Sequence, residues 1–227
     1  MSLQLFYHPL SSFCHKVLIA LYENATPFEG RLLQQTDPAT LEEFARLWPT
    51  SKMPLLRDLA NDRVVPETSI IIEYLQAVHP GQVRLIPADA RLASDVRLWD
   101  RLFDLYVHLP MQKIVGDSFR AGDAHDAAGV AEARALIRRS YAMVEQALGG
   151  REWIAGGAFS MADCAAAPAL FYADTVEPVG AGLPALTAYL NRLMARPSYA
   201  RVLEEAEPSF GMFPLDPKPS RAPRRAG

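Results

Sequence analysis

The chain has 227 residues, of which 50% are hydrophobic and 22% are charged, a composition typical of a folded globular protein. Its formal net charge of −3 gives no basic surface for a phosphate backbone, so we expect no nucleic-acid partner. It has two cysteines, no apolar run of membrane-spanning length, and no signal-peptide pattern in residues 1–15. These features exclude a disulfide-framework protein and predict a cytoplasmic location with no membrane partner.

The first 80 residues combine strand and helix patterns. A short run that ends at Tyr7 suits a buried strand, and Ser11 and Ser12 then supply N-cap chemistry for a helix. That helix has the apolar spacing i, i+3, i+4, i+7, which is formed by Cys14, Val17, Leu18 and Leu21. We next expect a second strand, an antiparallel hairpin and a helix, over residues 28–33, 54–66 and 67–78.

After Gly81 the pattern becomes helical. Residues 81–90 suggest a linker, and residues 91–210 predict an all-helical domain that follows an α/β domain over residues 1–80. Its first helix has one apolar stripe, made of Leu92, Val96, Trp99, Phe103 and Tyr106. Asp100 and Asp104 lie on the same helix, and we expect both to be solvated at the surface. Four prolines within residues 214–225 predict that residues 211–227 form a disordered tail.

Four segments together form a recognisable series. They are Tyr7-His-Pro-Leu-Ser-Ser-Phe-Cys-His-Lys-Val-Leu-Ile-Ala-Leu, Trp48-Pro-Thr-Ser-Lys-Met-Pro-Leu-Leu, Glu67-Thr-Ser-Ile-Ile-Ile-Glu-Tyr-Leu and Phe159-Ser-Met-Ala-Asp. In this order and spacing the chain resembles the cytosolic glutathione S-transferases, and its serine-containing loop is similar to those of the theta, zeta and bacterial types. The resemblance implies an α/β plus all-α fold, with a thioredoxin-like N-terminal domain followed by a helical-bundle C-terminal domain.

The resemblance also implies that a serine activates the thiol of glutathione, which serves as cosubstrate. A free thiol has a pKa of about 8.5, and both a hydroxyl donor and a helix N-terminus favour its anion. Ser11 follows a strand at the start of a helix, where the two effects coincide. Ser12 takes this role if the loop is registered one residue later. Tyr7 is a third candidate, although its alternation with Leu3 and Leu5 favours a core position.

Other residues are assigned to glutathione by the same resemblance. A cis bond between Met53 and Pro54 presents backbone groups to the cysteinyl unit, as in β-augmentation. Lys52 either meets the glycine carboxylate or is a plain solvated lysine. Glu67 and Thr68 meet the amino and carboxylate groups of the γ-glutamyl end, where a helix N-terminus favours the anion.

The second substrate is expected to lie against the helical domain. By resemblance its site is lined by apolar and aromatic residues near the fourth helix and after the last one, which suits a hydrophobic electrophile. The candidates are Tyr106, His108, Met111, Gln112, Phe210, Met212 and Phe213. Core or dimer contact is the alternative role for each of them.

Three further expectations concern structure rather than chemistry. Cys14 and Cys164 are predicted to be packed in the core, so disulfide exchange is not expected. Ser160 and Asp163 form a variant of the capping box. The five histidines show no metal-ligand spacing, so no metal is expected.

We therefore predict a glutathione transferase that acts on an electrophilic substrate, and that forms a homodimer. One alternative is a glutathione-dependent isomerase similar to maleylacetoacetate isomerases. Another is a non-catalytic ligand carrier or regulatory protein with the same fold. The identity of the electrophile does not follow from these residues.

Overall fold

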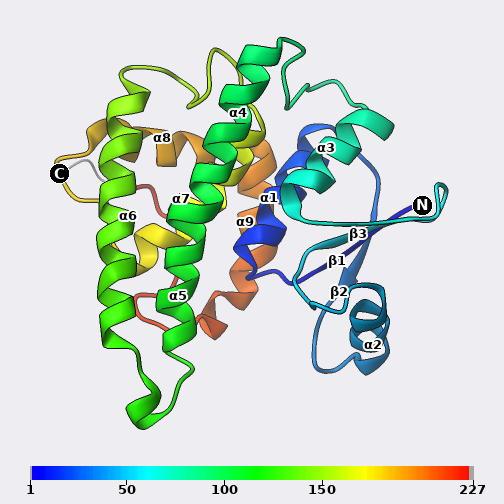
Figure 1. Cartoon of the computed structure of the whole chain (residues 1–227), viewed down its shortest axis with the longest axis horizontal. Helices are drawn as coiled ribbons and strands as arrows, with labels where there is room; N and C mark the ends of the chain where they lie inside the picture. The colour runs from blue at the N-terminus through cyan, green and yellow to red at the C-terminus, as the bar shows by residue number, and fades with distance from the viewer. Residues whose placement is uncertain (1, 225–227) are drawn as a thin grey trace.

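The computed structural model describes residues 2–224, which fold into two units placed side by side (Figure 1). The N-terminal unit contains, in chain order, β1 (Leu3–Tyr7), α1 (Ser12–Glu23), β2 (Glu29–Leu32), α2 (Pro38–Leu47), β3 (Leu55–Asp58), β4 (Arg63–Pro66) and α3 (Thr68–Val78). The predicted fold class, with a small mixed sheet followed by a helical domain, is confirmed.

The sheet has strand order β2-β1-β3-β4, in which β1 is parallel to β2 and antiparallel to β3. Side chains of a strand alternate between its faces, so β1 contributes to two cores. Leu3 and Leu5 pack with α1 and α3. Phe6 points to the other face, where its ring stacks on Phe44 of α2 with centroids 6.0 Å apart. The two faces of the sheet are thus covered by different helices.

The C-terminal unit is helical throughout. Its elements are α4 (Ala90–Phe103), the π-helical turn η1 (Asp104–His108), α5 (Leu109–Asp117), the short 3₁₀ turn η2 (Gly122–Ala124), α6 (Ala127–Leu148), α7 (Met161–Val176), α8 (Pro184–Ala195), α9 (Pro197–Ala206) and the 3₁₀ turn η3 (Glu207–Met212). The chain from 184 to 206 forms two helices because Pro197 begins a new one. No helix of residues 2–224 is both long and apolar enough to cross a membrane.

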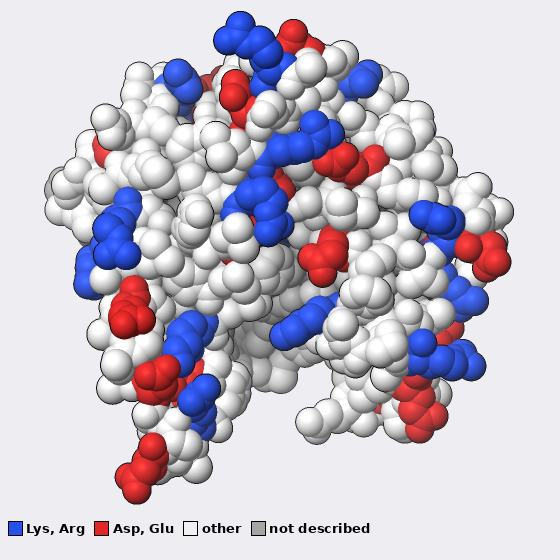
Figure 2. All heavy atoms as spheres, in the orientation of Figure 1, with Lys and Arg blue, Asp and Glu red and all other residues white. Residues whose placement is uncertain are grey.

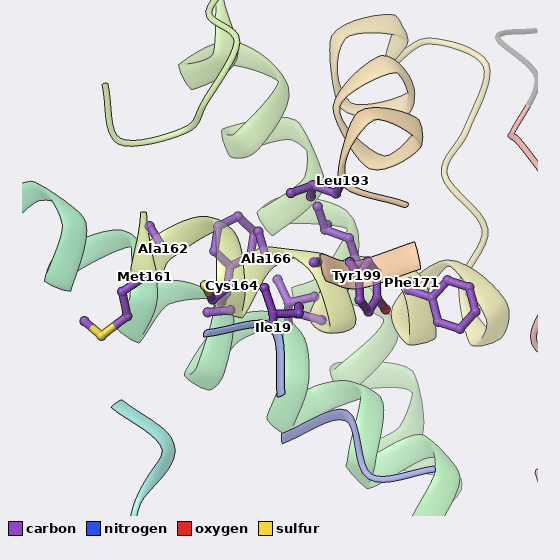
Figure 3. Packing of buried hydrophobic residues seen from close by; sticks show 14 of the residues in the cluster. Ile19, Met161, Ala162, Cys164, Ala166, Phe171, Leu193 and Tyr199 are labelled. Carbon is purple, nitrogen blue, oxygen red and sulfur yellow. The ribbon is translucent and has the colours of Figure 1, made fainter. Parts of the chain in front are cut away.

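Helix α7 is the centre of the molecule and is buried on all sides. Figure 3 shows Ile19 of α1, Leu193 of α8 and Tyr199 of α9 converging on it. Its start is fixed by Asp163, whose carboxylate accepts hydrogen bonds from the N–H and the O–H of Ser160, both at 2.9 Å. The predicted capping box is therefore confirmed, and Cys164 is fully buried as expected.

The C-terminal segment differs from its predicted disorder. Residues 213–224 have a defined path over the helical unit, with Phe213 and Pro219 buried. The path ends where Arg224 Nε donates to Asp174 Oδ2 of α7 at 2.6 Å. Composition alone misled here, because prolines that prevent helix formation do not prevent packing once side chains fasten the chain. The rest of the predicted tail, residues 225–227, lies outside the described residues.

Candidate active site

A cavity of about 880 Å³ lies between the two units. Figure 2 shows that the surface is hollowed at its lower edge, between α5 and the unit that carries α2, and that acidic and basic side chains are mixed around it. On the N-terminal side the cavity is bordered by all seven residues assigned to thiol activation or glutathione binding, namely Ser11, Ser12, Lys52, Met53, Pro54, Glu67 and Thr68. The structure thus brings together residues that are up to 57 positions apart in the sequence.

Ser11 is the N-cap of α1 and has extended backbone angles, φ −77° and ψ 111°. Its Oγ accepts a hydrogen bond from the N–H of Cys14 at 3.3 Å, which satisfies one of the free donors at the helix start. The hydroxyl oxygen acts as an acceptor in this cap, which holds the Ser11 side chain at the start of the helix. Ser12 is buried in the first turn, and within residues 2–224 its hydroxyl makes no hydrogen bond. Both serines border the cavity, so the two registers stay open.

Tyr7 does not border the cavity. It is half-buried at the end of β1, and its ring lies so close to Gly30 that a Cβ added there would be 3.0 Å from Tyr7 Cε1. Burial raises the pKa of Tyr7. A phenol packed in this way favours the core role over the catalytic one.

Cys14 packs in the core, as predicted. Its side chain is fully buried on α1, and burial raises the pKa of its thiol to about 12. A thiol with this pKa is almost entirely protonated near neutral pH, which excludes it as a reactive thiolate.

The loop before β3 carries the expected cis peptide bond between Met53 and Pro54. Within the described chain, the N–H and C=O of Met53 have no hydrogen-bond partner. Lys52 is exposed beside them and borders the same cavity. The loop therefore offers one backbone donor, one backbone acceptor and one cation to a ligand.

Glu67 and Thr68 form the start of α3. Glu67 has φ +67°, a left-handed conformation that is strained for a residue with a Cβ, and its side chain is exposed. It makes no side-chain cap bond to α3, so the first N–H groups of this helix lack that partner. Because α1 also begins at the cavity, two helix N-termini give it a partial positive charge that favours anionic groups.

A buried ion-pair network lies directly behind these two helix starts and corrects one expectation. Asp100 and Asp104 are not solvated, because Lys16 of α1, itself fully buried, has its Nζ 2.6 Å from Asp100 Oδ1 and 2.8 Å from Asp104 Oδ2. The Oγ of Ser69, the residue after Thr68, accepts from Lys16 Nζ at 2.9 Å and donates to Asp100 Oδ2 at 2.6 Å. The network therefore connects α1, α3 and α4.

The carboxyls of this network have opposite pKa shifts. Burial raises the pKa of Asp100 and outweighs the neighbouring Lys16. Burial also acts to raise the pKa of Asp104, but Lys16 and His108 overcome it and hold that pKa at about 2. Asp104, which borders the cavity, thus remains ionised.

The helical side of the cavity is mostly apolar. It is bordered by Leu105, Leu109, Met111, Gln112, Val115, Phe119, Tyr172, Met212, Phe213 and Pro214, and it continues into Leu10 and Phe13 of the N-terminal unit. This lining includes four of the candidates for the second-substrate site, Met111, Gln112, Met212 and Phe213. Such a wall suits a ligand with an apolar or aromatic body.

The other three candidates are not at the cavity. Tyr106 is 47% exposed outside it, His108 is fully buried with its ring 4.4 Å from that of Phe13, and Phe210 packs on Phe171 in the core. Tyr106 and His108 lie in the π-helical turn, where one extra residue per turn rotates the side chains by about 100° relative to an α-helical pattern. Leu92, the first residue of the predicted stripe, is also exposed.

Several cavity residues were not found from the sequence. His8 borders the cavity, its Nδ1 accepts from the N–H of Leu10 at 3.2 Å, and burial lowers its pKa. Because His8 lies in the loop between β1 and Ser11, its place in the sequence could have identified it as a cavity residue. Phe119 and Tyr172, which come from distant elements, carried no such local signal. Among residues 2–224 there is no group of three or more side chains arranged to hold a metal ion.

Comparisons with known proteins agree with this architecture. The family model described as "Glutathione S-transferase, N-terminal domain" matches residues 10–78, and the one described as "Glutathione S-transferase, C-terminal domain" matches residues 127–192. A curated relative, the FtsZ-localized protein A of Caulobacter vibrioides, is 29% identical over 91% of this chain and 92% of that protein.

Two solved structures are also similar. A glutathione S-transferase from Methylobacterium radiotolerans, in complex with glutathione sulfonate, is 29% identical with a TM-score of 0.77, over 88% of this chain and 93% of that chain. A second, from Methylobacillus flagellatus with glutathione bound, is 26% identical with a TM-score of 0.80, over 88% of this chain and 98% of that chain. On its two domains, their order and these matches, the chain belongs to the glutathione S-transferase family.

Proposed function

We propose that this protein is a glutathione transferase in which Ser11 and the N-terminus of α1 stabilise the thiolate of bound glutathione. The observation that carries the proposal is the state of the Ser11 hydroxyl. Its oxygen accepts a hydrogen bond from the N–H of Cys14, which holds it at the start of α1, and the residue borders the cavity. In this role the hydroxyl donates a hydrogen bond to the sulfur of glutathione and is not itself a nucleophile.

Glutathione is oriented by the N-terminal unit. The backbone groups of Met53 pair with the cysteinyl unit, which places the sulfur near the start of α1. Lys52 meets the glycine carboxylate. The γ-glutamyl end lies at the start of α3, where the free N–H groups attract its carboxylate and Glu67 attracts its ammonium group.

The chemistry that follows requires only a modest change in pKa. A thiol with a pKa of about 8.5 must lose its proton near neutral pH, and each unit of depression corresponds to about 1.4 kcal/mol of preference for the anion. One charge-assisted hydrogen bond and one helix N-terminus supply this amount. The thiolate then forms a bond to an electrophilic carbon of the second substrate, whose bonding electrons move to a leaving group or to an adjacent atom that takes up a proton.

The second substrate lies against the apolar wall of the helical unit. Leu105, Leu109 and Met111 face the same cavity as Ser11, so an apolar electrophile bound there is next to the sulfur. This arrangement supports conjugation of hydrophobic electrophiles. Detoxification is the corresponding role in the cell, and we propose a cytoplasmic location for it.

We also propose that the protein is a homodimer. Ile70 of α3 and Leu98 of α4 are 54% and 62% exposed, and we assign these two apolar side chains to the contact face between the subunits. Sedimentation equilibrium tests this directly. A dimer is expected, and a monomer at micromolar concentration would contradict it.

A non-catalytic protein with the same fold is the alternative, and one comparison favours it. The similar FtsZ-localized protein A has a name that describes a location and not a reaction. A chain with only such a role does not need the full set of glutathione-facing residues around one cavity. Catalysis therefore remains the better supported function.

Calorimetry followed by activity assays separates these functions. We expect the full chain to bind glutathione and then to conjugate at least one member of a panel of aryl halides, epoxides and maleyl compounds; reduction of peroxides is assayed separately. Absence of glutathione binding would contradict the proposal and favour the non-catalytic role. Isomerisation of maleyl compounds without conjugation would identify an isomerase.

A further inference from the structure

Residues 213–224, which we call the C-terminal strap, run from the cavity to the far side of α7 and α8. The strap begins as a wall of the cavity. Phe213, which is 5% exposed, stacks on Tyr172 with ring centroids 6.0 Å apart and an interplanar angle of 28°. Phe213, Tyr172 and Pro214 all border the cavity. The position of this first part of the strap therefore sets the width of the cavity on its apolar side.

The strap ends at Arg224, which is held by two helices. Its backbone N–H donates to Asn191 Oδ1 of α8 at 2.7 Å, and its C=O accepts from Asn191 Nδ2 at 2.8 Å. Its Nε donates to Asp174 Oδ2 of α7 at 2.6 Å, in a pair whose side chains are only 15% and 13% exposed. A partly buried, charge-assisted contact of this kind is stronger than an exposed ion pair.

Arg224 also shapes the strap itself. Its guanidinium Nη1 donates to the carbonyl oxygens of Ser220 and Ala222 at 2.8 and 2.7 Å. One side chain therefore folds the last five residues of the strap and fastens them to α7. Besides Arg224, the strap has two exposed ion pairs, Arg221 with Glu207 and Lys218 with Asp216, and a hydrogen bond from Lys218 Nζ to the carbonyl of Phe213. Leu215 and Pro219 are packed against the helical unit.

We propose that Arg224 is a positioning residue for the second substrate, and that it acts by holding Phe213 and Pro214 as a fixed wall of the cavity. The inference rests on the proposed function in that it assigns this wall to the electrophile. A chain segment that is fixed at one end only samples many conformations, and ordering it on ligand binding costs conformational entropy. Because Arg224 fastens the strap, the strap is already ordered before the substrate binds, and binding does not have to supply that entropy cost.

The wall held by Arg224 determines which chemical class of ligand fits the cavity. The wall presents the Phe213 ring, the Pro214 ring and the Tyr172 ring to the cavity, and none of these is charged. It therefore favours an uncharged, flat aromatic body. Glutathione, which faces the opposite side of the cavity, does not depend on Arg224.

The test uses the full chain and an uncharged aromatic fluorophore, N-phenyl-1-naphthylamine, whose binding needs no turnover. Its affinity is measured for the wild type, for Arg224→Ala, Phe213→Ala and the double variant, and for Arg224→Lys. Arg221→Ala is the matched control, because it removes an arginine of the same strap that makes only the exposed pair with Glu207. Glutathione affinity is measured in parallel by calorimetry.

We expect Arg224→Ala to weaken fluorophore binding by about fivefold, equivalent to about 1 kcal/mol, with Arg221→Ala unchanged and Arg224→Lys intermediate. Because Arg224 acts through Phe213, the double variant should bind no more weakly than Phe213→Ala. Unchanged affinity in Arg224→Ala, strictly additive effects, or no binding by the wild type would overturn the proposal. If the wild type does not bind glutathione but the fluorophore results are as expected, the proposed function is overturned and the role of Arg224 is not.

Discussion

The ammonium of Lys16 lies 2.6 Å from Asp100 Oδ1, and neither side chain is more than 1% exposed. The two residues are on α1 and α4, so this ion pair joins the two units of the molecule in their shared interior. Asp104 shares the same ammonium at 2.8 Å and borders the cavity. A contact that contributes to the domain interface thus also fixes one wall of the candidate site.

Replacing Lys16 should strongly destabilise the protein. Lys16→Met keeps the length of the side chain but leaves two buried carboxylates without their cation, and breaking such a pair costs about 3–5 kcal/mol. Urea denaturation measures this loss. Lys113→Met is the control, since Lys113 pairs with Asp126 at a partly exposed site and should cost under about 1 kcal/mol. Equal losses in the two variants would contradict the account.

The stability of the protein should fall as the pH decreases from about 6.5 to about 4. His15 is fully buried, and burial lowers its pKa to about 4. In this window the unfolded chain takes up a proton, because a free histidine has a pKa of about 6.5, whereas the folded chain does not. The stabilisation from neutral His15 is therefore fully present above about pH 6.5. Between about pH 6.5 and about pH 4 the free energy of unfolding decreases by about 3 kcal/mol because of this group.

The control for this pH dependence is His15→Gln, which removes the titrating group. Burial also lowers the pKa of His8 and His108, so part of the slope should persist in the variant. Unfolding free energies measured at several pH values should show a smaller change in His15→Gln than in the wild type. An identical change would mean that His15 does not titrate as its burial requires.

Cys14 should be dispensable for catalysis. Its thiol is buried with a pKa of about 12, so Cys14→Ser should leave the rate of conjugation within about threefold of the wild type once folding is confirmed. The matching assay is reduction of a small disulfide by glutathione. If wild-type protein catalyses that reduction and Cys14→Ser does not, the thiol is a redox group and the serine-based account is wrong.

Glu67 should act on glutathione and not on the electrophile. Glu67→Gln removes the charge that attracts the γ-glutamyl ammonium, so KM for glutathione should rise about tenfold, while kcat at saturating glutathione changes little. Glu132→Gln is the control, because Glu132 is exposed on α6 away from the cavity. A rise in the KM of the electrophile alone would assign Glu67 to the other half of the site.

Local sequence patterns were sufficient for most of the N-terminal unit. The strand that ends at Tyr7 and the cap at Ser11 each depend on residues that are neighbours in the chain, whereas the cis bond at Met53 was expected from the family resemblance. Helix α2 was missed even though Asp37 caps it and Pro38 occupies its first position, which are ordinary start signals. Its apolar face, formed by Leu41, Phe44 and Leu47 at intervals of three residues, was also present in the sequence and was overlooked.

The errors in the helical unit have a different origin. From the sequence alone, Asp100 and Asp104 have the pattern of surface residues. Their partner Lys16 lies 84 and 88 positions earlier in the chain, so no local pattern indicates that they are buried. Tyr106 and His108 were assigned to the second-substrate site by resemblance, from their place at the end of the fourth helix, and η1 there turns their side chains away from the directions of a regular α-helix. The strap was misread because the partner of Arg224 on α7 is 50 positions away.

The central claim is that Ser11 lowers the pKa of the bound thiol, and the most direct measurement is the ultraviolet absorbance of the thiolate of bound glutathione as a function of pH. We compare the wild type with Ser11→Ala and Ser12→Ala, each saturated with glutathione. The account predicts that Ser11→Ala alone raises the pKa of the thiol by about one unit or more and slows conjugation about tenfold. A thiol pKa that is unchanged in Ser11→Ala, or that rises only in Ser12→Ala, would contradict it.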